Sequence, residues 1–344
     1  MRAVVMRAVG DPSVLRVEEC PVPVAGPHQA LLRVGAVGVS YHDVVERNGV
    51  FRGSLHLPAI LGNEIAGTVV ALGELVSTLK IGDRVCAKGF SACGRCRFCR
   101  NGMETACPDR KVVHGGYAEY TAVDEEALVG IPDAVSFSQA CSLGSAIAVA
   151  LHAVRDAAKV KLNESVLVTG ATGGVGLPAV EIAKAAGAIV IAVTRSDAKR
   201  QALLDAGADH VVLLREGQDF TDEVRALTEG QGVDVVIDNV GSRVFTPSFR
   251  SLAVGGRYAF VGQLFREDIA INPARIFFKR ATLIGVASAR RDHIEDAARL
   301  IVAGKVHPRV ARVFPLEEAD RAHAMVEAGE ATGRVVLHPT PEAG

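Results

Sequence analysis

Hydrophobic residues follow two different patterns along this chain. Residues 1–130 carry short apolar runs interrupted by glycine and proline, for example at 30–34, 64–70 and 84–87. Alternation between apolar and polar positions, bounded by turn residues, is typical of half-buried strands. We therefore predict an irregular antiparallel β domain in the first third of the chain.

From about residue 132, apolar strands alternate with segments of helical period. Strands are expected at 165–169, 189–193, 210–214, 233–237 and 257–261. Helices are expected at 177–186 and 197–206, closed by Gly187 and Gly207. Strand–helix alternation with short connections predicts a parallel sheet covered on both faces. Right-handed crossovers make this a doubly wound α/β fold.

The pattern changes again after about residue 288. A helix is expected at 291–303, a strand at 308–314, a helix at 316–327 and a last strand at 334–337. This tail is too short to fold alone, so we expect it to pack on another part. The predicted domains are 1–135, 136–288 and the returning tail 289–344.

A glycine-rich loop follows the predicted strand 165–169 and opens the next helix. Glycines let the backbone turn sharply and approach a pyrophosphate, which the helix N-terminus attracts. The strand–loop–helix context favours a dinucleotide site over a plain glycine-rich turn. The candidate residues are Gly170, Thr172, Gly173, Gly174, Val175 and Gly176.

The end of the next strand bears on the choice of cofactor. Thr194, Arg195 and Ser196 stand where an acidic residue would bind the ribose hydroxyls of NAD. Arg195 and Ser196 suit a 2′-phosphate instead, and Lys199 adds positive charge. We expect NADPH rather than NADH, with a solvated helix start as the alternative.

Two later strand ends carry further candidates for cofactor binding. Asn239 follows the strand 233–237, and Val261 and Gly262 end or follow the strand 257–261. Ligands of open parallel sheets lie beyond the carboxyl ends of the strands. These residues are therefore expected beside the nicotinamide, although ordinary loop roles explain them equally well.

Four of the seven cysteines form a cluster at metal-ligand spacing. Cys93, Cys96, Cys99 and Cys107 are separated by two, two and seven residues. Four thiolates predict one closed, tetrahedral zinc site that stabilises a loop and leaves no position for substrate. An iron–sulfur cluster is the less favoured reading.

Composition limits the partners. The chain has 344 residues, 22% of them charged, and a formal net charge of -1. This gives no electrostatic case for binding nucleic acid or an anionic membrane. We see no signal-peptide pattern and no uncharged apolar run of about 18 residues, so we expect a cytoplasmic protein without a membrane span.

Several motifs together give the chain a family resemblance. Residues 38–43, 61–67, 82–85, 93–107, 114–120 and 170–176 match, in order, those of the zinc-type medium-chain dehydrogenase/reductase superfamily. The chain resembles it essentially end to end. The resemblance implies a GroES-like β-rich catalytic domain, a Rossmann domain, a tail belonging to the catalytic part, and a homodimer or homotetramer acting on a small molecule.

The chain departs from the alcohol dehydrogenases of this superfamily at their catalytic zinc. Ser40 and Asn63 stand at the cysteine and histidine ligand positions, and residues 143–145 offer no good third ligand. Hydroxyl and amide groups are poor zinc ligands. The glycine loop and residues 281–305 are similar to those of quinone reductases and the acryloyl-coenzyme A reductase-like group, respectively.

We therefore expect an NADPH-dependent hydride transfer to an activated C=C bond (an enone, enal or enoyl thioester) without catalytic zinc. Tyr41 is the first candidate for the proton donor and His42 the second, while Asn63 is placed to bind the substrate carbonyl. Arg290 and Arg291 could steer an anionic carrier, or be ordinary solvated charges. The alternatives are a quinone reductase, an alcohol dehydrogenase with atypical zinc ligands, and a non-catalytic NADPH-binding protein.

Overall fold

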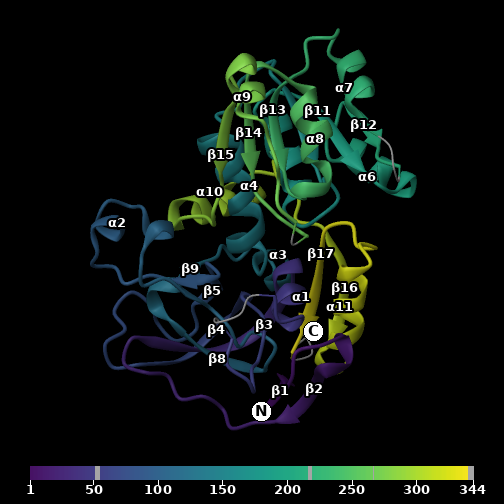
Figure 1. Ribbon diagram of the computed structural model, residues 1–344. Helices are drawn as coiled ribbons and strands as arrows, with labels where there is room; N and C mark the ends of the chain where they lie inside the picture. Colours follow the sequence, from purple (N-terminus) through teal and green to yellow (C-terminus); the bar gives the residue numbers. More distant parts are fainter. Residues whose placement is uncertain (51–54, 216–218, 266, 340–344) are drawn as a thin grey trace. The chain divides into compact units, whose positions relative to one another are not determined.

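The computed structural model describes residues 1–50, 55–215, 219–265 and 267–339. The chain folds into two compact units (Figure 1). Unit 1 comprises Met1–Ala148, Ser288–Ala303 and Pro308–Gly344. Unit 2 comprises Val149–Ala287 and Gly304–His307.

Unit 1 is organised around a seven-stranded sheet. Its main path runs β16-β17-β3-β4-β5-β9, and β8 pairs with β3 off this path. Only the β16–β17 pair is parallel among the described strands of this sheet. The strands are β3 (Gln29–Val39), β4 (Glu64–Leu72), β5 (Arg84–Ala87), β8 (Tyr120–Asp124), β9 (Leu128–Gly130), β16 (Val310–Pro315) and β17 (Arg334–His338).

Shorter elements complete unit 1. Two small antiparallel sheets pair β1 (Arg2–Met6) with β2 (Leu15–Glu19), and β6 (Phe90–Ser91) with β7 (Lys111–Val112). The helices are α1 (Tyr41–Arg47), α2 (Arg97–Arg100), α3 (Phe137–Ala140), α10 (Arg291–Val302) and α11 (Ala319–Glu327). Single turns are η1 (Pro12–Val14), η2 (Glu104–Ala106), η3 (Glu125–Ala127), η4 (Leu143–Ile147) and η7 (Leu316–Glu318).

The alternation seen in the sequence of β3 explains its position. Ala30, Leu32 and Val34 are fully buried, whereas Arg33 between them is exposed. One face of the strand therefore enters the core of unit 1, as the period-2 pattern requires. Because β17 pairs with β3, the C-terminal strand completes the sheet begun near the N-terminus.

A buried polar network joins α1 to α11 within this core. The guanidinium of Arg47 lies 3.3 Å from Nδ1 of His323 and donates to Glu327 at 2.8 Å. The hydroxyl of Tyr117 is 2.9 Å from Nε2 of His323. Burial, reinforced by the charge of Arg47, lowers the pKa of His323 to about 3, so this imidazole stays neutral.

Unit 2 contains a parallel six-stranded sheet in the order β12-β11-β10-β13-β14-β15. Its strands are β10 (Ser165–Thr169), β11 (Ile189–Thr194), β12 (His210–Leu213), β13 (Val233–Asp238), β14 (Leu252–Phe260) and β15 (Thr282–Gly285). Its helices and turns are α5 (Gly176–Ala185), η6 (Asp197–Lys199), α6 (Arg200–Asp205), α7 (Thr221–Leu227), α8 (Ser242–Ser251) and α9 (Pro273–Lys279). The order confirms the predicted doubly wound α/β fold class beside a β-rich part.

The structure differs from the sequence-based expectation in two segments. Strand β14 begins at Leu252, five residues before the predicted strand, because the chain leaves α8 directly into the sheet. Gly255 interrupts the apolar pattern there and has a φ of 81°, which hid this part of the strand.

The second difference is a helical stretch from Phe137 to Ala157 that the sequence analysis missed. It includes α3, η4, α4 (Ala148–Leu151) and the wider turns of η5 (His152–Ala157). By length and composition alone it could cross a membrane, but 72% of its apolar window is buried inside the protein. Core helices of globular proteins pass the same test.

Candidate functional site

The glycine-rich loop connects β10 to α5 in unit 2, in the arrangement that the sequence predicts. Gly170 has a φ of 57°, a conformation that other residues rarely adopt. The N–H of Gly173 donates to the carbonyl of Gly170 at 3.0 Å, which closes the turn. A Cβ at Gly176 would lie 2.2 Å from the carbonyl oxygen of Gly170, so glycine is required where α5 begins. The N–H groups of Leu177 and Ala179 already donate to Gly173 and Val175, and Pro178 has none, so an amide donor to a pyrophosphate must come from the residues before Leu177.

Residues after β13 and β14 meet the glycine loop at the carboxyl edge of the sheet. The side-chain amide of Asn239 donates to the carbonyl of Thr169 at 2.9 Å. A Cβ at Gly262 would lie 2.6 Å from the carbonyl oxygen of Asn239. The N–H groups of Val261 and Gly262 both donate to the carbonyl of Asp238, at 2.8 and 3.1 Å. The three residues predicted to flank the nicotinamide are therefore neighbours.

Asp238 organises this edge, although the sequence analysis did not single it out. Its carboxylate accepts from the hydroxyls of Thr169 at 2.6 Å and Tyr258 at 2.7 Å. It also accepts from the N–H groups of Val240 and Gly241. Burial, together with the Asp238 charge, raises the pKa of Tyr258 far above its usual value. A buried carboxylate with this many donors holds the ends of β10, β13 and β14 together.

The end of β11 presents the candidates for a 2′-phosphate. Thr194 is buried, and its hydroxyl accepts from the N–H of Ser196 at 3.2 Å. Arg195 is exposed. Asp197, the first acid after the strand, is paired with Arg200 at 2.9 Å. Lys199 lies in the same turn, so positive and hydroxyl groups gather at this strand end.

The four clustered cysteines form a compact lobe (the cysteine lobe, residues 93–107) in unit 1. Their sulfur atoms all lie within 4.8 Å of one another. Thiolates about 2.3 Å from a tetrahedral ion stand roughly 3.8 Å apart, so the arrangement fits one zinc ion. Gly94 and Gly102 have φ values of 67° and 69°, which makes the tight turns between the cysteines. In the part of the chain that the structure describes, this is the one group of histidine, cysteine or acidic residues with metal-site geometry.

Backbone amides point at the sulfur atoms of the lobe. The N–H groups of Cys93, Cys96 and Cys99 each donate to a neighbouring sulfur at 3.4–3.5 Å. Hydrogen bonds from the amides of Arg95 and Cys96 lower the pKa of Cys93 to about 7. Burial and contacts with neighbouring thiols raise the pKa of Cys99 to about 12. The Cys93 thiolate therefore forms readily, whereas a bound cation would be needed to displace the proton of Cys99 near neutral pH.

The three positions of a catalytic zinc site in related alcohol dehydrogenases carry other chemistry here. The amide and hydroxyl of Ser40 both donate to the carboxylate of Asp43, at 2.8 and 2.7 Å. Asn63 is 8% exposed, and its side-chain oxygen has no hydrogen-bond partner among the described residues. A Cβ at Gly89 would lie 2.5 Å from the hydroxyl of Ser145 and 4.0 Å from the amide nitrogen of Asn63. Asn63 and Ser145 therefore converge, but as an amide and a hydroxyl.

Helix α1 supplies both candidate proton donors. Tyr41 is its first residue and is partly buried, and its hydroxyl makes no hydrogen bond within the described ranges. His42 follows, with Nδ1 3.6 Å from the carboxylate of Glu46 one turn further along. The other oxygen of Glu46 lies 2.9 Å from Nε2 of His114. Glu46 itself was not a sequence candidate, because its partner His114 is 68 residues away.

A second buried carboxylate lies beside Asn63. Burial raises the pKa of Glu64 to about 7, which the charge of Arg334 partly opposes. The Nε atom of Arg334 is 3.0 Å from Oε2 of Glu64. Burial also raises the pKa of Asp43. Both residues lie in the motifs at 38–43 and 61–67, but their raised pKa could not be read from the sequence because it comes from burial.

The predicted basic pair after β15 has structural partners within unit 1. Arg290 forms a two-pronged ion pair with Asp292, at 3.0 and 2.6 Å. The backbone N–H of Arg291 donates to Glu104, and its side chain donates to the carbonyl of Glu126 at 2.9 Å. These contacts favour the structural reading of the pair over the steering of an anionic carrier.

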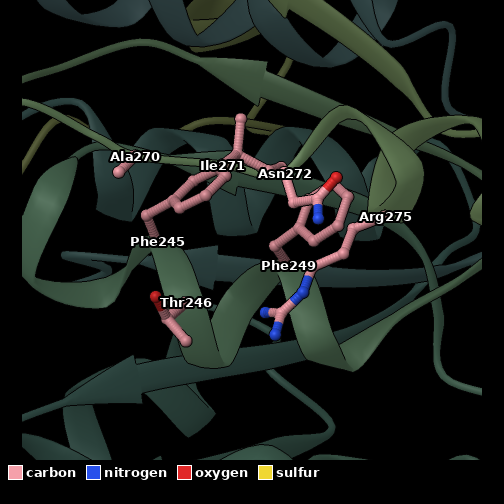
Figure 2. Close-up of a pocket in the computed structure, with 7 residues that line it drawn as sticks. All are labelled: Phe245, Thr246, Phe249, Ala270, Ile271, Asn272 and Arg275. Carbon is pink, nitrogen blue, oxygen red and sulfur yellow. The ribbon is translucent and has the colours of Figure 1, made fainter.

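Unit 2 also has a surface cavity of about 490 Å³. Figure 2 shows its lining, with the side chain of Arg275 extending from α9 past the ring of Phe249. Phe245 and Phe249, both on α8, stack with ring centres 5.5 Å apart. None of the predicted cofactor-binding residues lines this cavity.

Comparison with known families identifies both parts of the chain. Residues 26–133 match the alcohol dehydrogenase GroES-like domain. Residues 174–303 match the zinc-binding dehydrogenase family. The first match includes β3, β4, β5, β8 and β9 of the antiparallel sheet, and the second includes β11 to β15 of the doubly wound sheet.

Curated relatives align with this chain almost end to end. An acryloyl-coenzyme A reductase of Sulfurisphaera tokodaii is 31% identical over 98% of this chain and 100% of its own length. A quinone oxidoreductase of Mus musculus is 31% identical, covering 98% and 97%. An NAD-dependent alcohol dehydrogenase of Sulfolobus acidocaldarius is 33% identical, covering 99% and 100%.

Solved structures agree with the observed fold. The crystal structure of a protein named AibC superposes with a TM-score of 0.92 and 39% identity, covering 99% of this chain and 96% of that one. A zinc-binding dehydrogenase from Sinorhizobium meliloti 1021, solved with NADP bound, gives a TM-score of 0.86 at 28% identity, covering 98% and 99%. The chain thus belongs to the zinc-type medium-chain dehydrogenase/reductase superfamily and is an oxidoreductase.

Proposed function

We propose that this oxidoreductase uses NADPH to reduce an activated C=C bond in a small molecule, such as an enone, an enal or an enoyl thioester. The observation that carries the proposal is the donor set at Ser40, Asn63 and Ser145. Alcohol oxidation in this superfamily needs a Lewis acid to stabilise an alkoxide. This set does not fit a zinc ion, because the Ser40 hydroxyl donates to Asp43 and the other two groups are an amide and a hydroxyl.

Reduction of a conjugated C=C bond can proceed without such a Lewis acid. The reduced nicotinamide supplies a hydride, which the β-carbon of the substrate accepts. The resulting enolate needs hydrogen bonds to its oxygen and a proton at its α-carbon. Asn63 is buried, and the N–H groups of its side-chain amide suit the first task because they can donate to that oxygen. Tyr41 or His42 suits the second, with solvent as the alternative proton source.

Three features support NADPH as the cofactor. The glycine loop makes a tight turn of the kind that a dinucleotide site uses, since a Cβ at Gly176 would lie 2.2 Å from the carbonyl oxygen of Gly170. The end of β11 offers Arg195 and Ser196 but no unpaired acid among the described residues. The Sinorhizobium meliloti neighbour binds NADP. One zinc ion in the cysteine lobe completes the proposed cofactors, and a cytoplasmic homo-oligomer the proposed setting.

A quinone reductase is the second candidate, favoured by the similarity to the Mus musculus quinone oxidoreductase. It would use the same fold and cofactor, and would not need a placed proton donor. NADPH oxidation measured on matched panels of enones, enoyl thioesters and quinones separates the two. Faster turnover of every quinone would replace the proposed substrate class.

Metal content tests the donor-set argument directly. Protein purified without added zinc should contain about one zinc ion per chain by mass spectrometry. Replacing Cys96 with serine should remove that zinc, whereas the core substitution Cys141→Ser serves as a cysteine control and should retain it. About two zinc ions per chain, one of them kept in Cys96→Ser, would instead establish an alcohol-dehydrogenase-like centre.

Tyr41→Phe tests the first proton donor. If Tyr41 donates the proton, this variant should transfer hydride in a single turnover but take up the proton more slowly. Unchanged hydride transfer and proton uptake would remove Tyr41 from the mechanism.

A further inference from the structure

Three side chains of unit 1 lie side by side, one pair within hydrogen-bonding distance and the other within ion-pair distance; we call them the His–Glu–His cluster (His42, Glu46 and His114). Glu46 Oε1 lies 2.9 Å from Nε2 of His114. Glu46 Oε2 lies 3.6 Å from Nδ1 of His42. One carboxylate therefore stands between two imidazoles and faces each with a different oxygen.

The local fold explains this arrangement. His42 and Glu46 are four residues apart on α1, so their side chains share one face of the helix. His114 comes from the segment between β7 and β8. Its neighbour Gly115 has a φ of 93°, which sets the turn that carries the imidazole.

Burial differs sharply along the cluster. The side chain of Glu46 is 1% exposed, whereas those of His42 and His114 are 35% and 23% exposed. A buried carboxylate is stable only when it is paired. Oε2 of Glu46 has no hydrogen bond within the described residues, and His42 is the group that it faces. Each end of the cluster thus meets solvent, and the middle does not.

Other charged groups surround the cluster. Asp43 lies on the same helix, Tyr117 follows His114, and Glu64 and Arg334 come from β4 and β17. Burial and the charges of Asp43, Glu64 and Glu46 raise the pKa of Tyr117, so it stays a neutral phenol. Burial alone would lower the pKa of His114, but the hydrogen bond to Glu46 and the charges of Glu46 and Asp43 raise it overall. The raised pKa of His114 favours its protonated form.

We propose that Glu46 and His114 are a proton relay that resupplies His42 during substrate reduction. His42, rather than Tyr41, is then the residue that protonates the α-carbon. This inference rests on the proposed function, since the reduction of a C=C bond consumes one proton per turnover. Glu46 and His114 act through His42 and are positioning residues.

The relay moves one proton per turnover in a series of single transfers. The proton on Nε2 of His42 moves to the α-carbon of the enolate, forming the C–H bond. A proton leaves Nε2 of His114 for Oε1 of Glu46, and rotation of the protonated carboxyl group brings it to Nδ1 of His42, which must close from 3.6 Å to hydrogen-bonding distance. His114 ends neutral and takes a new proton from water, and His42 re-equilibrates its two ring nitrogens through its solvent-exposed edge. Overall, one proton passes from solvent to product.

The linkage between the two histidines can be measured without any substrate. NMR titration of the imidazole signals should show the pKa of His114 about one unit lower in Glu46→Gln than in the unsubstituted protein. His114→Gln should change the titration of His42, because the two rings share one carboxylate. The exposed residue His28 serves as a control, since His28→Gln should leave both titrations unchanged. A His42 titration that is identical with and without His114 would overturn the relay.

Kinetic measurements on the panel of enones and enoyl thioesters then test whether the relay is used in catalysis. In Glu46→Gln, kcat should fall roughly tenfold with an unchanged KM for NADPH, and the effect of D₂O on kcat should rise as proton transfer becomes limiting. Added imidazole should restore part of the activity of His114→Ala. A loss of kcat that follows a lower melting temperature, with an unchanged D₂O effect, would make the cluster merely structural.

The two proposals fail separately. Linked titration of His42 and His114 with no turnover on enones or thioesters would leave the relay standing and remove the proposed substrate class. The opposite result is turnover of enones, with histidines that titrate independently and with unchanged kinetics in Glu46→Gln. It would support the proposed substrate class and remove the relay.

Discussion

At the scale of single residues, the charges at the end of β11 come from Arg195, Asp197 and Arg200. Arg195 is exposed, while the neighbouring acid Asp197 is held by Arg200. A 2′-phosphate near Arg195 would therefore meet a guanidinium, and the charge of the nearby Asp197 carboxylate would be partly offset by Arg200.

Replacing Arg195 with alanine should raise the Kd for NADPH roughly tenfold to hundredfold, the usual worth of a hydrogen bond to a charged group. The Kd for NADH should change little, because NADH lacks the 2′-phosphate. Fluorescence titration with each nucleotide measures both constants, with Arg225→Ala on α7 as the control. Equal losses for the two nucleotides would mean that Arg195 does not read the phosphate.

His323 shows how burial of one residue controls stability against pH. Its pKa falls to about 3 in the folded protein, through burial and the charge of Arg47, whereas a histidine in the unfolded chain titrates near 6.5. Between these values the unfolded chain binds a proton that the folded protein does not. Stability should therefore fall as pH drops below about 6.5, by up to about 1.4 kcal/mol for each pH unit from this residue.

In His323→Gln this contribution disappears, so the pH dependence of unfolding between pH 6.5 and 5 should become flatter. Urea unfolding at several pH values measures it, and His28→Gln should keep the original slope. Glu64 acts in the opposite direction, because its raised pKa favours the folded state as pH falls from about 7 to 4.5. Glu64 is present in both proteins, so its contribution cancels when the two slopes are compared. An unchanged slope in His323→Gln would contradict a neutral buried imidazole.

At the scale of elements, the joint between β10 and α5 depends on close backbone packing. The missing side chain of Gly176 brings the helix start within van der Waals contact of the Gly170 carbonyl, where a Cβ would lie 2.2 Å away. Backbone cannot yield as a flexible side chain can, so any larger residue must displace the loop.

Gly176→Ala should lower the free energy of unfolding by roughly 1–3 kcal/mol and weaken NADPH binding at the same time. Gly130→Ala is the matched control, because a Cβ there meets nothing within 4 Å. Denaturant unfolding and nucleotide titration measure the two effects. Wild-type binding and stability in Gly176→Ala would show that the loop tolerates displacement.

At the scale of the whole molecule, unit 2 carries an exposed apolar surface near an edge strand. Phe277 and Phe278 on α9 are 61% and 77% exposed, and Leu283 on β15 is 37% exposed. Within the described residues, β15 pairs only with β14, so one edge keeps free backbone groups. A second copy of the chain is the partner we propose for this edge.

If this edge joins two copies as proposed, Phe278→Asp should shift the protein toward monomer, because a buried charge at an apolar interface is costly. Light scattering after size-exclusion chromatography measures the mass. Val24→Asp, at an exposed apolar residue of unit 1, should leave the mass unchanged. An unaltered oligomer in Phe278→Asp would place the interface elsewhere.

Features that depend on residues close together in the sequence could be predicted well. The glycines at 170–176 and the cysteines at 93–107 act through neighbours only a few residues away, so their spacing already contains their geometry. Strand–helix alternation predicts the doubly wound sheet for the same reason, since each period is local. The start of β14 was missed because Gly255 breaks the local pattern, although pairing with β13 forms the strand.

The sequence by itself determined the fold class, the glycine-rich loop between β10 and α5, the cysteine lobe and the absence of thiolate or imidazole at positions 40 and 63. Only the tertiary structure decided which ionisable groups interact. Glu46 meets His114 across 68 residues, and Asp238 meets Thr169 across 69. Burial then sets the pKa of Glu64 and His323, and burial is a property of the folded core. Local spacing specifies backbone geometry, whereas proton affinity depends on distant neighbours and on the exclusion of water.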